Sequence, residues 1–395
     1  MDALTTPSNW QRVRLWDIAE IKRGASPRPI ENPKWFCANS NVGWVRISDI
    51  SKNSRFLYKT AQKLSKKGIE KSRLVKQNSL IMSMCATIGK PIITKIDTCI
   101  HDGFVVFENP KIDLNYLYYF LCYIEKEWLE SGQQGSQVNL NVDLIKNKEV
   151  FYPKDLNEQI AIANILSDVD RYLYSLDALI LKKESVKKAL SFELLSQRKR
   201  LKGFNQAWQK VRLGDIGKPC MCKRVMKHQT TRYGEIPFYK IGTFGNTADA
   251  FISKKLFLEY KTKYSFPKKG DILISASGTI GRAVIYDGKP AYFQDSNIVW
   301  IDNDETLVKN DFLFYAYSNI KWNTEHTTIL RLYNDNFRNT LIPLPPLNEQ
   351  IAIANILSAL DNEIIGLKNK KRQFENIKKA LNHDLMSAKI RVLKK

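Results

Sequence analysis

The stretch Leu156-Asn157-Glu158-Gln159-Ile160-Ala161-Ile162-Ala163-Asn164-Ile165-Leu166-Ser167 occurs a second time, without a change, at positions 347–358. The two copies lie 191 positions apart in a chain of 395 residues. The repeat extends outward, because Val13-Arg14-Leu15 returns 198 positions later as Val211-Arg212-Leu213, and Thr87-Ile88-Gly89 returns 192 positions later as Thr279-Ile280-Gly281. The chain is therefore an internal duplication in which each half has a variable middle and a fixed end.

Each copy of the repeated stretch is expected to open a long helix. Pro153 and Pro345-Pro346 stand just before the copies, Asn157 and Asn348 are the expected capping amides, and an acid follows in the first turn. Apolar residues then advance mostly by threes and fours, which indicates one packed helical face. In the first helix these residues are Val169, Leu173, Leu176, Ile180, Val186, Leu190 and Leu194. The equivalent positions of the second helix are Leu360, Ile364, Leu367, Lys371, Ile377 and Leu385, with Phe374 where the first helix has Lys183.

The exchange of lysine for phenylalanine between the copies, and of Ile180 for Lys371, indicates two non-identical helices that pair with each other or with partners. A buried core helix is the alternative explanation for any such apolar face. About 40 residues would form a helix of roughly 60 Å at 1.5 Å per residue, which is too long for the interior of either half.

The segments 19–150 and 217–340 have a different pattern. They contain short β-branched and aromatic runs, such as 43–47, 271–275 and 297–301, separated by glycine, proline and asparagine. Each segment also contains one amphipathic helical stretch, around 114–129 and 311–322. The predicted order along the chain is domain, helix, domain, helix.

The net charge of +22 is distributed over the whole chain. Residues 1–150, 151–206, 207–342 and 343–395 carry net charges of +7, +3, +7 and +5. Because both halves share the excess, we favour attraction to a polyanion, most simply nucleic acid, over solubility alone.

Other patterns exclude several classes of protein. The six cysteines have neither paired C-x-x-C spacing nor a nearby histidine cluster, which argues against zinc. There is no signal-peptide-like beginning and no apolar run near the ~20 residues that span a bilayer, so a cytoplasmic location without membrane contact is expected. No G-x-x-x-x-G-K-[ST] phosphate loop occurs, and Asn32-Pro33-Lys34-Trp35 is interpreted as a loop turn and not as a methyltransferase motif.

The chain resembles the specificity subunits of type I restriction-modification systems over nearly its whole length. The resemblance rests on a proline followed by Leu-x-Glu-Gln at the start of each long helix, at 153–159 and 345–350. The Trp-x-x-Val-Arg-Leu-x-Asp-Ile openings of both halves, the stretch 44–50 and Gly135-Ser136-Gln137-Val138-Asn139 are similar to the family as well. The second half has Thr327-Thr328-Ile329-Leu330 in place of a clear Gly-Ser-Gln motif.

The resemblance implies an α+β fold in which two mixed α/β target recognition domains are separated by two long antiparallel coiled-coil spacer helices, with a pseudo-twofold internal repeat. The implied boundaries are 1–152 for the first recognition domain, 153–203 for the first spacer helix, 204–343 for the second domain and 344–395 for the second spacer helix. Each domain would read one half of a split, asymmetric target in double-stranded DNA, with half-targets about one helical turn, ~34 Å, or slightly more apart.

The resemblance also implies partners and the absence of catalysis on this chain. The helices would dock two methyltransferase subunits, and restriction subunits would join that core. No cofactor is expected on this chain, whereas S-adenosylmethionine, ATP and Mg²⁺ are expected on the partner subunits.

Planar amides, guanidinium groups and small hydroxyls on glycine-containing loops are the side chains best suited to read bases. The candidates for DNA binding are Arg23, Ser26, Arg28, Gln133, Gln134, Ser136, Gln137, Asn139, Arg282, Arg331, Tyr333, Asn334 and Asn336. The candidate positions for the spacer helices and their partners are Leu156, Glu158, Gln159, Leu176, Leu190, Leu347, Glu349, Gln350, Leu367, Phe374 and Leu381. No catalytic or metal-binding residue is assigned.

Two other functions remain open on sequence grounds. A self-sufficient methyltransferase or nuclease could draw on the four histidines and on acids such as Asp102 and Asp295, although His101-Asp102 and Gln294-Asp295 are better explained as structural turns. A helical scaffold whose basic domains bind RNA or protein is the third hypothesis.

Overall fold

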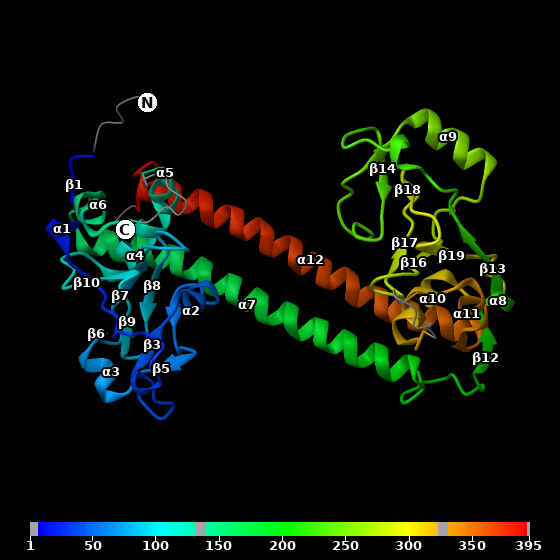
Figure 1. Ribbon diagram of the computed structural model, residues 1–395, viewed down its shortest axis with the longest axis horizontal. Helices are drawn as coiled ribbons and strands as arrows, with labels where there is room; N and C mark the ends of the chain where they lie inside the picture. The colour runs from blue at the N-terminus through cyan, green and yellow to red at the C-terminus, as the bar shows by residue number, and fades with distance from the viewer. Residues whose placement is uncertain (1–6, 132–139, 323–330, 393–395) are drawn as a thin grey trace. The chain divides into compact units, whose positions relative to one another are not determined.

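The computed structural model describes residues 7–131, 140–322 and 331–392. It confirms an α+β fold with two mixed domains, each followed in sequence by one helix of 40 residues, α7 (Leu156–Leu195) and α12 (Leu347–Met386). These two helices run antiparallel and side by side (Figure 1). The internal contacts divide the chain into two compact units, residues 1–177 with 370–395 and residues 178–369, so each unit contains one domain and parts of both long helices.

The first domain is framed by the antiparallel pair of β1 (Trp10–Arg14) and β11 (Glu149–Pro153), through which the chain enters and leaves it. Its strands form a five-stranded sheet of order β2-β10-β7-β8-β4 and a four-stranded sheet of order β5-β3-β9-β6. The strands are β2 (Glu20–Arg23), β3 (Gly43–Val45), β4 (Phe56–Leu57), β5 (Gln62–Lys63), β6 (Arg73–Val75), β7 (Leu80–Ser83), β8 (Pro91–Thr94), β9 (Thr98–Ile100) and β10 (Phe104–Glu108). The helices are α1 (Leu15–Ile18), η1 (Pro33–Trp35), α2 (Ile47–Ser51), α3 (Lys66–Glu70), α4 (Leu114–Tyr123), α5 (Glu125–Ser131) and α6 (Val142–Asn147).

The second domain repeats this plan with fewer strands. The pair of β12 (Gln209–Arg212) and β20 (Leu341–Leu344) frames it, and its sheets have the orders β13-β19-β16-β17 and β15-β14-β18. The strands are β13 (Gly217–Met221), β14 (Ile236–Tyr239), β15 (Phe251–Ile252), β16 (Ile272–Ser275), β17 (Ala283–Ile285), β18 (Tyr292–Phe293) and β19 (Ile298–Asn303). The helices are α8 (Leu213–Ile216), η2 (Lys227–Gln229), α9 (Lys254–Lys263), α10 (Asn310–Ala316), η3 (Tyr317–Asn319) and α11 (Asn334–Asn339).

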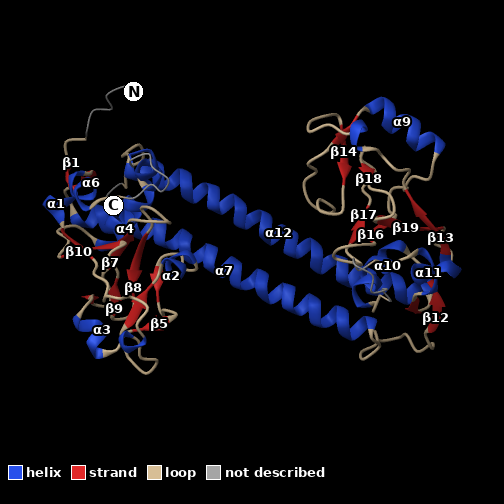
Figure 2. Ribbon diagram, viewed as in Figure 1, coloured by secondary structure: helices blue, strands red, loops and turns tan. Residues whose placement is uncertain are grey.

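One apolar core of each unit lies between its larger sheet, the domain helices, the beginning of the long helix that follows and the end of the other long helix. Figure 2 shows these elements by secondary structure. Ile162, Ala163 and Leu166 of the repeated stretch are buried in the first unit, and their counterparts in the second, including Leu357, are buried as well. The identity of the two copies thus has a packing reason, because each presents the same apolar face to its own domain.

The structure corrects some of the expected helix boundaries. The helix α7 begins at Leu156, and its first turn is capped by Asp155, whose Oδ1 accepts a hydrogen bond from the Asn157 backbone N–H at 3.0 Å. Asn157 therefore lies inside the helix, because an acid that also favours the cap position stands two residues earlier. The helical stretch expected near 114–129 is divided into α4 and α5 at Ile124, and the one near 311–322 ends as the short η3.

The repeated Thr-Ile-Gly turns have a structural role. Gly89 and Gly281 have φ of +75° and +82°, a conformation that side chains other than glycine rarely adopt. A Cβ atom at either glycine would lie within 2.3 Å of a tryptophan, Trp128 or Trp322 respectively. Both turns therefore require glycine for backbone conformation and for close packing.

All six cysteines are free; Cys99 and Cys222 are buried, and Cys37 is exposed. Within the described ranges, no helix is both long enough and apolar enough to cross a membrane.

Candidate nucleic-acid interface

The Glu-Gln pair of each repeated stretch fastens the start of a long helix to the domain before it. In the first unit, Glu158 accepts hydrogen bonds from Asn9 Nδ2 at 2.9 Å and from the Trp10 indole N–H at 3.2 Å. Gln159 accepts a bond from the Asp113 backbone N–H and donates one to the Pro153 carbonyl, both at 2.8 Å. The first turn of α7 is thereby hydrogen-bonded to residues near the beginning and the end of the first domain.

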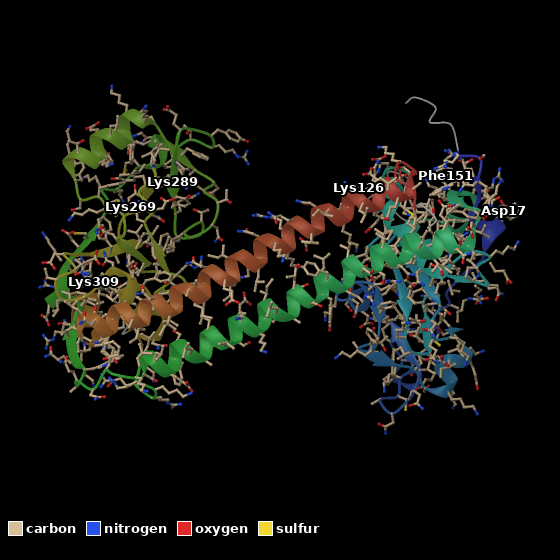
Figure 3. All side chains as sticks on the ribbon, turned by 180° about the vertical axis from the view of Figure 1, so that it is seen from behind. Asp17, Lys126, Phe151, Lys269, Lys289 and Lys309 are labelled. Atoms are coloured by element: carbon tan, nitrogen blue, oxygen red, sulfur yellow. The ribbon has the colours of Figure 1, made fainter. Side chains whose placement is uncertain are left out.

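The second unit repeats this fastening with more partners. Glu349 is almost completely buried, accepts the Trp208 indole N–H at 3.0 Å and forms a two-pronged ion pair with Arg200. Gln350 accepts a bond from the Lys309 backbone N–H at 2.8 Å and donates to the carbonyls of Leu307 and Pro345. Figure 3 labels Lys309 in this region. These four motif residues therefore make contacts within the chain.

The inter-helix seam follows the sequence pattern except at one position of each helix. Leu176 and Ile180 are buried, and Leu190, Leu367, Phe374 and Leu381 are half-buried. Val186 and Ile377, which were expected in the seam, are 44% and 50% exposed. Lys187 and Lys378, one residue further along, face the opposite helix in their place. Leu156 and Leu347, at the first helical positions, are also exposed.

The two lysines belong to a polar arrangement that occurs once in each unit. Lys187 of α7 pairs with Asp361 of α12, whose other oxygen accepts the Tyr315 hydroxyl of α10 at 2.8 Å. In the first unit, Lys378 of α12 pairs with Asp170 of α7, which accepts the Tyr119 hydroxyl of α4 at 2.7 Å. Burial and then the neighbouring aspartate raise the pKa of both tyrosines, so each hydroxyl keeps the proton that it donates. Both long helices are thus tied to a domain helix.

The structure also explains the exchange of Lys183 for Phe374. Lys183 forms an ion pair with Glu363 at 2.8 Å, and Glu363 is equivalent by the repeat to Tyr172. The ring of Tyr172 lies 4.5 Å, centroid to centroid, from the ring of Phe374. Equivalent positions therefore carry an ion pair in one unit and an aromatic pair in the other.

Three of the predicted DNA-binding residues of the first domain converge on one turn, formed by residues 101–103 between β9 and β10. Asp102 accepts hydrogen bonds from Ser26 Oγ at 2.8 Å and Arg28 Nη2 at 2.9 Å through its carboxylate, and from Arg23 Nε at 2.7 Å through its backbone carbonyl. Partial burial works to raise the pKa of Asp102, but the Ser26 hydroxyl, a backbone N–H of the turn and the charge of Arg28 hold it below its usual value. The carboxylate is therefore ionised at neutral pH.

His101 is part of the packing beneath this turn. Its Nδ1 accepts a hydrogen bond from the Gly103 backbone N–H at 2.9 Å, and its ring contacts those of Trp44 and Phe104. Burial is the largest influence on the imidazole and lowers its pKa, in spite of the nearby Asp102. The ring is therefore neutral at neutral pH, which supports a structural role.

The equivalent turn of the second domain, residues 294–297 between β18 and β19, gathers a different set. Asp295 pairs with Arg224 Nε at 3.1 Å, and Ser296 Oγ lies 2.6 Å from Arg331 Nη2. Gln294 accepts the Ile241 backbone N–H, and Ser277 donates to Asn297. Arg331 was predicted from the sequence, whereas Arg224 was not.

The other candidates of the second domain lie elsewhere. Arg282 is exposed and donates a hydrogen bond to the Phe244 carbonyl at 3.0 Å. Tyr333 is 40% exposed and precedes α11, in which Asn334 and Asn336 lie. Asn336 lines a cavity of about 450 Å³ that also borders Phe192 and Asn339.

Five candidates of the first domain, Gln133, Gln134, Ser136, Gln137 and Asn139, fall outside the described residues. Sequence reasoning missed Arg224, which stands in the loop after β13. The sequence did contain one signal, because His101-Asp102 and Gln294-Asp295 place an aspartate at related positions of the two halves. An aspartate on a basic domain indicates a nearby arginine or lysine as its partner. In the described part of the chain, no group of three or more histidines, cysteines and acids is placed to hold a metal ion.

Comparison with known proteins agrees with this arrangement. Residues 7–183 and 205–375 match the family described as the type I restriction modification DNA specificity domain. Over 193 residues the chain is 52% identical to a Haemophilus influenzae protein whose name describes it as a type I restriction enzyme specificity subunit, a match that covers 47% of this chain and about half, 50%, of that protein. It is 25% identical over 425 residues to the type I restriction enzyme MjaVIII specificity subunit of Methanocaldococcus jannaschii, covering 99% and 95% of the two chains.

Solved structures have the same fold. The S subunit of a type I restriction-modification system from M. genitalium superposes with a TM-score of 0.60 at 15% identity, covering 97% of both chains. A chain from a structural study of complex assembly in the type I system gives a TM-score of 0.62 at 16% identity, covering 97% of this chain and 98% of the other.

Duplicated basic domains with arginine-bearing turns, joined to a pair of antiparallel helices, define a subunit that selects DNA. The chain belongs to the family of type I restriction-modification DNA specificity subunits. Subunits of this family provide the DNA target specificity of their systems and are themselves non-catalytic.

Proposed function

We propose that each of the two domains contacts one half of a split, asymmetric DNA target. The proposal rests chiefly on equivalent turns that carry different exposed groups. The turn of Asp102 holds Arg23, Ser26 and Arg28, whereas the turn of Asp295 holds Arg224 and, through Ser296, Arg331. Because the framework is repeated and the sets of polar groups at the two turns differ, the two half-targets are expected to differ in sequence.

Affinity and specificity would come from different residues. Each domain region carries a net charge of +7, and basic side chains such as Lys269 and Lys289 belong to the second domain (Figure 3). Lysines of this kind attract phosphates in a salt-dependent manner without distinguishing bases. Guanidinium groups held in a fixed orientation can distinguish base edges in the major groove.

We also propose that the long helices dock two methyltransferase subunits. Apolar side chains are exposed at matching positions of α7 and α12: Ile160 and Ile351 are 38% and 42% exposed, and Tyr174 and Ile365 are 76% and 55% exposed. Fourteen residues, about four helical turns, separate the two positions of each helix, so they share a face. A matched apolar face on each copy supports two identical partners bound in equivalent ways.

The remaining steps of such a complex would then take place on other chains. In this proposal, restriction subunits join the core formed with the methyltransferase subunits. The methyltransferase subunits would use S-adenosylmethionine, and the restriction subunits would use ATP and Mg²⁺.

The proposal is tested by reconstituting the chain with its methyltransferase subunit and sequencing adenine methylation in the treated DNA at the level of single molecules. The expected result is one recurrent motif made of two unlike half-targets with a fixed number of arbitrary bases between them. The methyltransferase subunit alone serves as the control and should give no such motif. Methylation without a recurrent split motif would contradict the proposal.

The docking face is tested with charge substitutions at Tyr174 and Ile365. Tyr174→Glu and Ile365→Glu should each reduce the bound methyltransferase subunits from two to one, and the double variant should bind none, because a carboxylate would be buried without a partner. Sedimentation analysis measures the stoichiometry. Tyr174→Phe and Ile365→Leu preserve the apolar surface and should retain two. Two bound subunits on the double variant would exclude this face.

A further inference from the structure

The two recognition domains share one polar feature that their sequences do not reveal. In both domains, the smaller sheet contains one parallel pair of strands, β3 with β9 in the first domain and β14 with β18 in the second. An aspartate stands two residues after the later strand of this pair, β9 or β18. In both, this aspartate pairs with an arginine from the loop after the first strand of the larger sheet, β2 or β13. The pairs are Arg28–Asp102 at 2.9 Å and Arg224–Asp295 at 3.1 Å.

The two pairs are alike in exposure as well. The arginine side chains are 71% and 70% exposed, while the aspartates are less exposed, at 41% and 19%. Each acid therefore sits lower in the surface than the guanidinium that it holds. One guanidinium nitrogen is engaged, and the remaining N–H groups of the fork remain available to a ligand.

Stability does not account for this duplication, because an ion pair with so exposed a partner contributes little to folding. A carboxylate on a basic DNA-binding surface also repels phosphate and weakens general attraction. Its retention in both domains is explained if it fixes the direction of an arginine, since a planar guanidinium must be oriented to engage a base edge or phosphate with two hydrogen bonds.

We propose that Arg28 and Arg224 are matched DNA-contacting residues, one in each domain, and that Asp102 and Asp295 are the positioning residues that orient them. This inference rests on the proposed contact of both domains with DNA. The groups beside each arginine differ, with Ser26 and Arg23 at the first turn and Ser296 and Arg331 at the second. A common arginine with different neighbours allows one framework to serve two half-targets.

The test uses the reconstituted complex with the four variants Asp102→Asn, Asp295→Asn, Arg28→Lys and Arg224→Lys. For each, Kd is measured for target DNA, for DNA altered in one half-target only, and for DNA without the target. Arg28→Lys and Arg224→Lys retain the charge at highly exposed positions, so folding is not in question. Asp97→Asn, which breaks the exposed pair of Asp97 with Lys76, is the matched control.

Asp102→Asn and Arg28→Lys should each reduce discrimination at one half-target about 10- to 100-fold and leave the other half unchanged, as expected for loss of an oriented two-pronged contact. Asp295→Asn and Arg224→Lys should do the same at the opposite half. Binding to DNA without the target should stay equal or become slightly tighter in the asparagine variants, because a negative charge is removed.

Two results would overturn the inference. Unchanged discrimination in the variants of either pair would show that its arginine does not select DNA. An equal gain in affinity for all DNA, as large as that of Asp97→Asn and without loss of discrimination, would show that the aspartate acts only through its charge. Failure of the proposed function itself is recognised separately, because the unaltered complex would then show no half-target to compare.

Discussion

Replacing Gln350 with leucine is expected to lower the free energy of unfolding of the second unit by about 3–6 kcal/mol, because a buried polar group left without a partner costs roughly 1–3 kcal/mol. The substitution leaves three groups without this partner, the Lys309 backbone N–H and the carbonyls of Leu307 and Pro345, of which the first two are only partly buried and therefore fall near the lower end of that cost. Leucine fits the fully buried site by size, so the loss of hydrogen bonds is the main effect. Denaturant unfolding combined with hydrogen exchange would measure the change and assign it to the unit.

Three other variants give free energies of unfolding with which this result can be compared. Gln159→Leu strands two groups in place of three and should cost correspondingly less. Gln350→Glu keeps the acceptor for Lys309 but loses both donated bonds, so it should also destabilise the unit. Asn348→Ala, at an exposed position of the same turn, should change stability by no more than about 0.5 kcal/mol. A Gln350→Leu variant within 1 kcal/mol of the unaltered protein would refute the fastening role of this side chain.

Exchanging one domain for a copy of the other is expected to change the DNA target completely in one half. The two frames show where to join the segments, because Val13 pairs with Val150 and Val211 pairs with Ile342. Replacing residues 19–149 with residues 217–341 therefore preserves both framing pairs. The incoming domain would meet the same buried face of α7, since Ile162, Ala163 and Leu166 are identical to their counterparts in α12.

The chimera should direct methylation to a symmetric target, in which the half-target of the second domain occurs twice as an inverted repeat. The antiparallel packing of α7 and α12 provides the reason, because it gives the duplicated helices opposite directions. Sequencing of methylated adenines measures the outcome, and the reciprocal chimera with two first domains is the matched control. Methylation that still requires the original first half-target would contradict the assignment of one domain to each half.

The fold follows from the sequence where the chain repeats itself or keeps a regular period. The two long helices, their order relative to the domains and the tight glycine turns are all predictable, because each depends on local spacing or on a local backbone requirement. The prediction that Val186 and Ile377 lie in the seam was wrong for a physical reason. Apolar periodicity assigns them to the seam, but the lysines that follow them form ion pairs with aspartates of the opposite helix and occupy the seam instead. The cap was misassigned because Asp155 and Asn157 are both good capping residues.

The candidate site was less accessible to sequence reasoning. Arg23, Ser26 and Arg28 were selected by residue type and a nearby glycine, and Arg331 by residue type alone. The structure brings them to equivalent turns. Their hydrogen-bond partners stand about 35 to 80 positions away in the sequence. No periodic sequence pattern connects residues so far apart, so these hydrogen bonds could not be predicted from the sequence. Arg224 and the role of the two aspartates therefore became evident only once the sheets placed the turns beside the loops.

The exchange of an ion pair for an aromatic pair gives the two units different physical sensitivities. Lys183 and Glu363 attract each other through partly exposed charges, so dissolved salt weakens that contact. Tyr172 and Phe374 are held by exclusion of water from their rings, which salt does not screen and which cooling weakens. At these equivalent positions, the inter-helix contact of the second unit therefore responds to ionic strength, and that of the first unit responds to temperature.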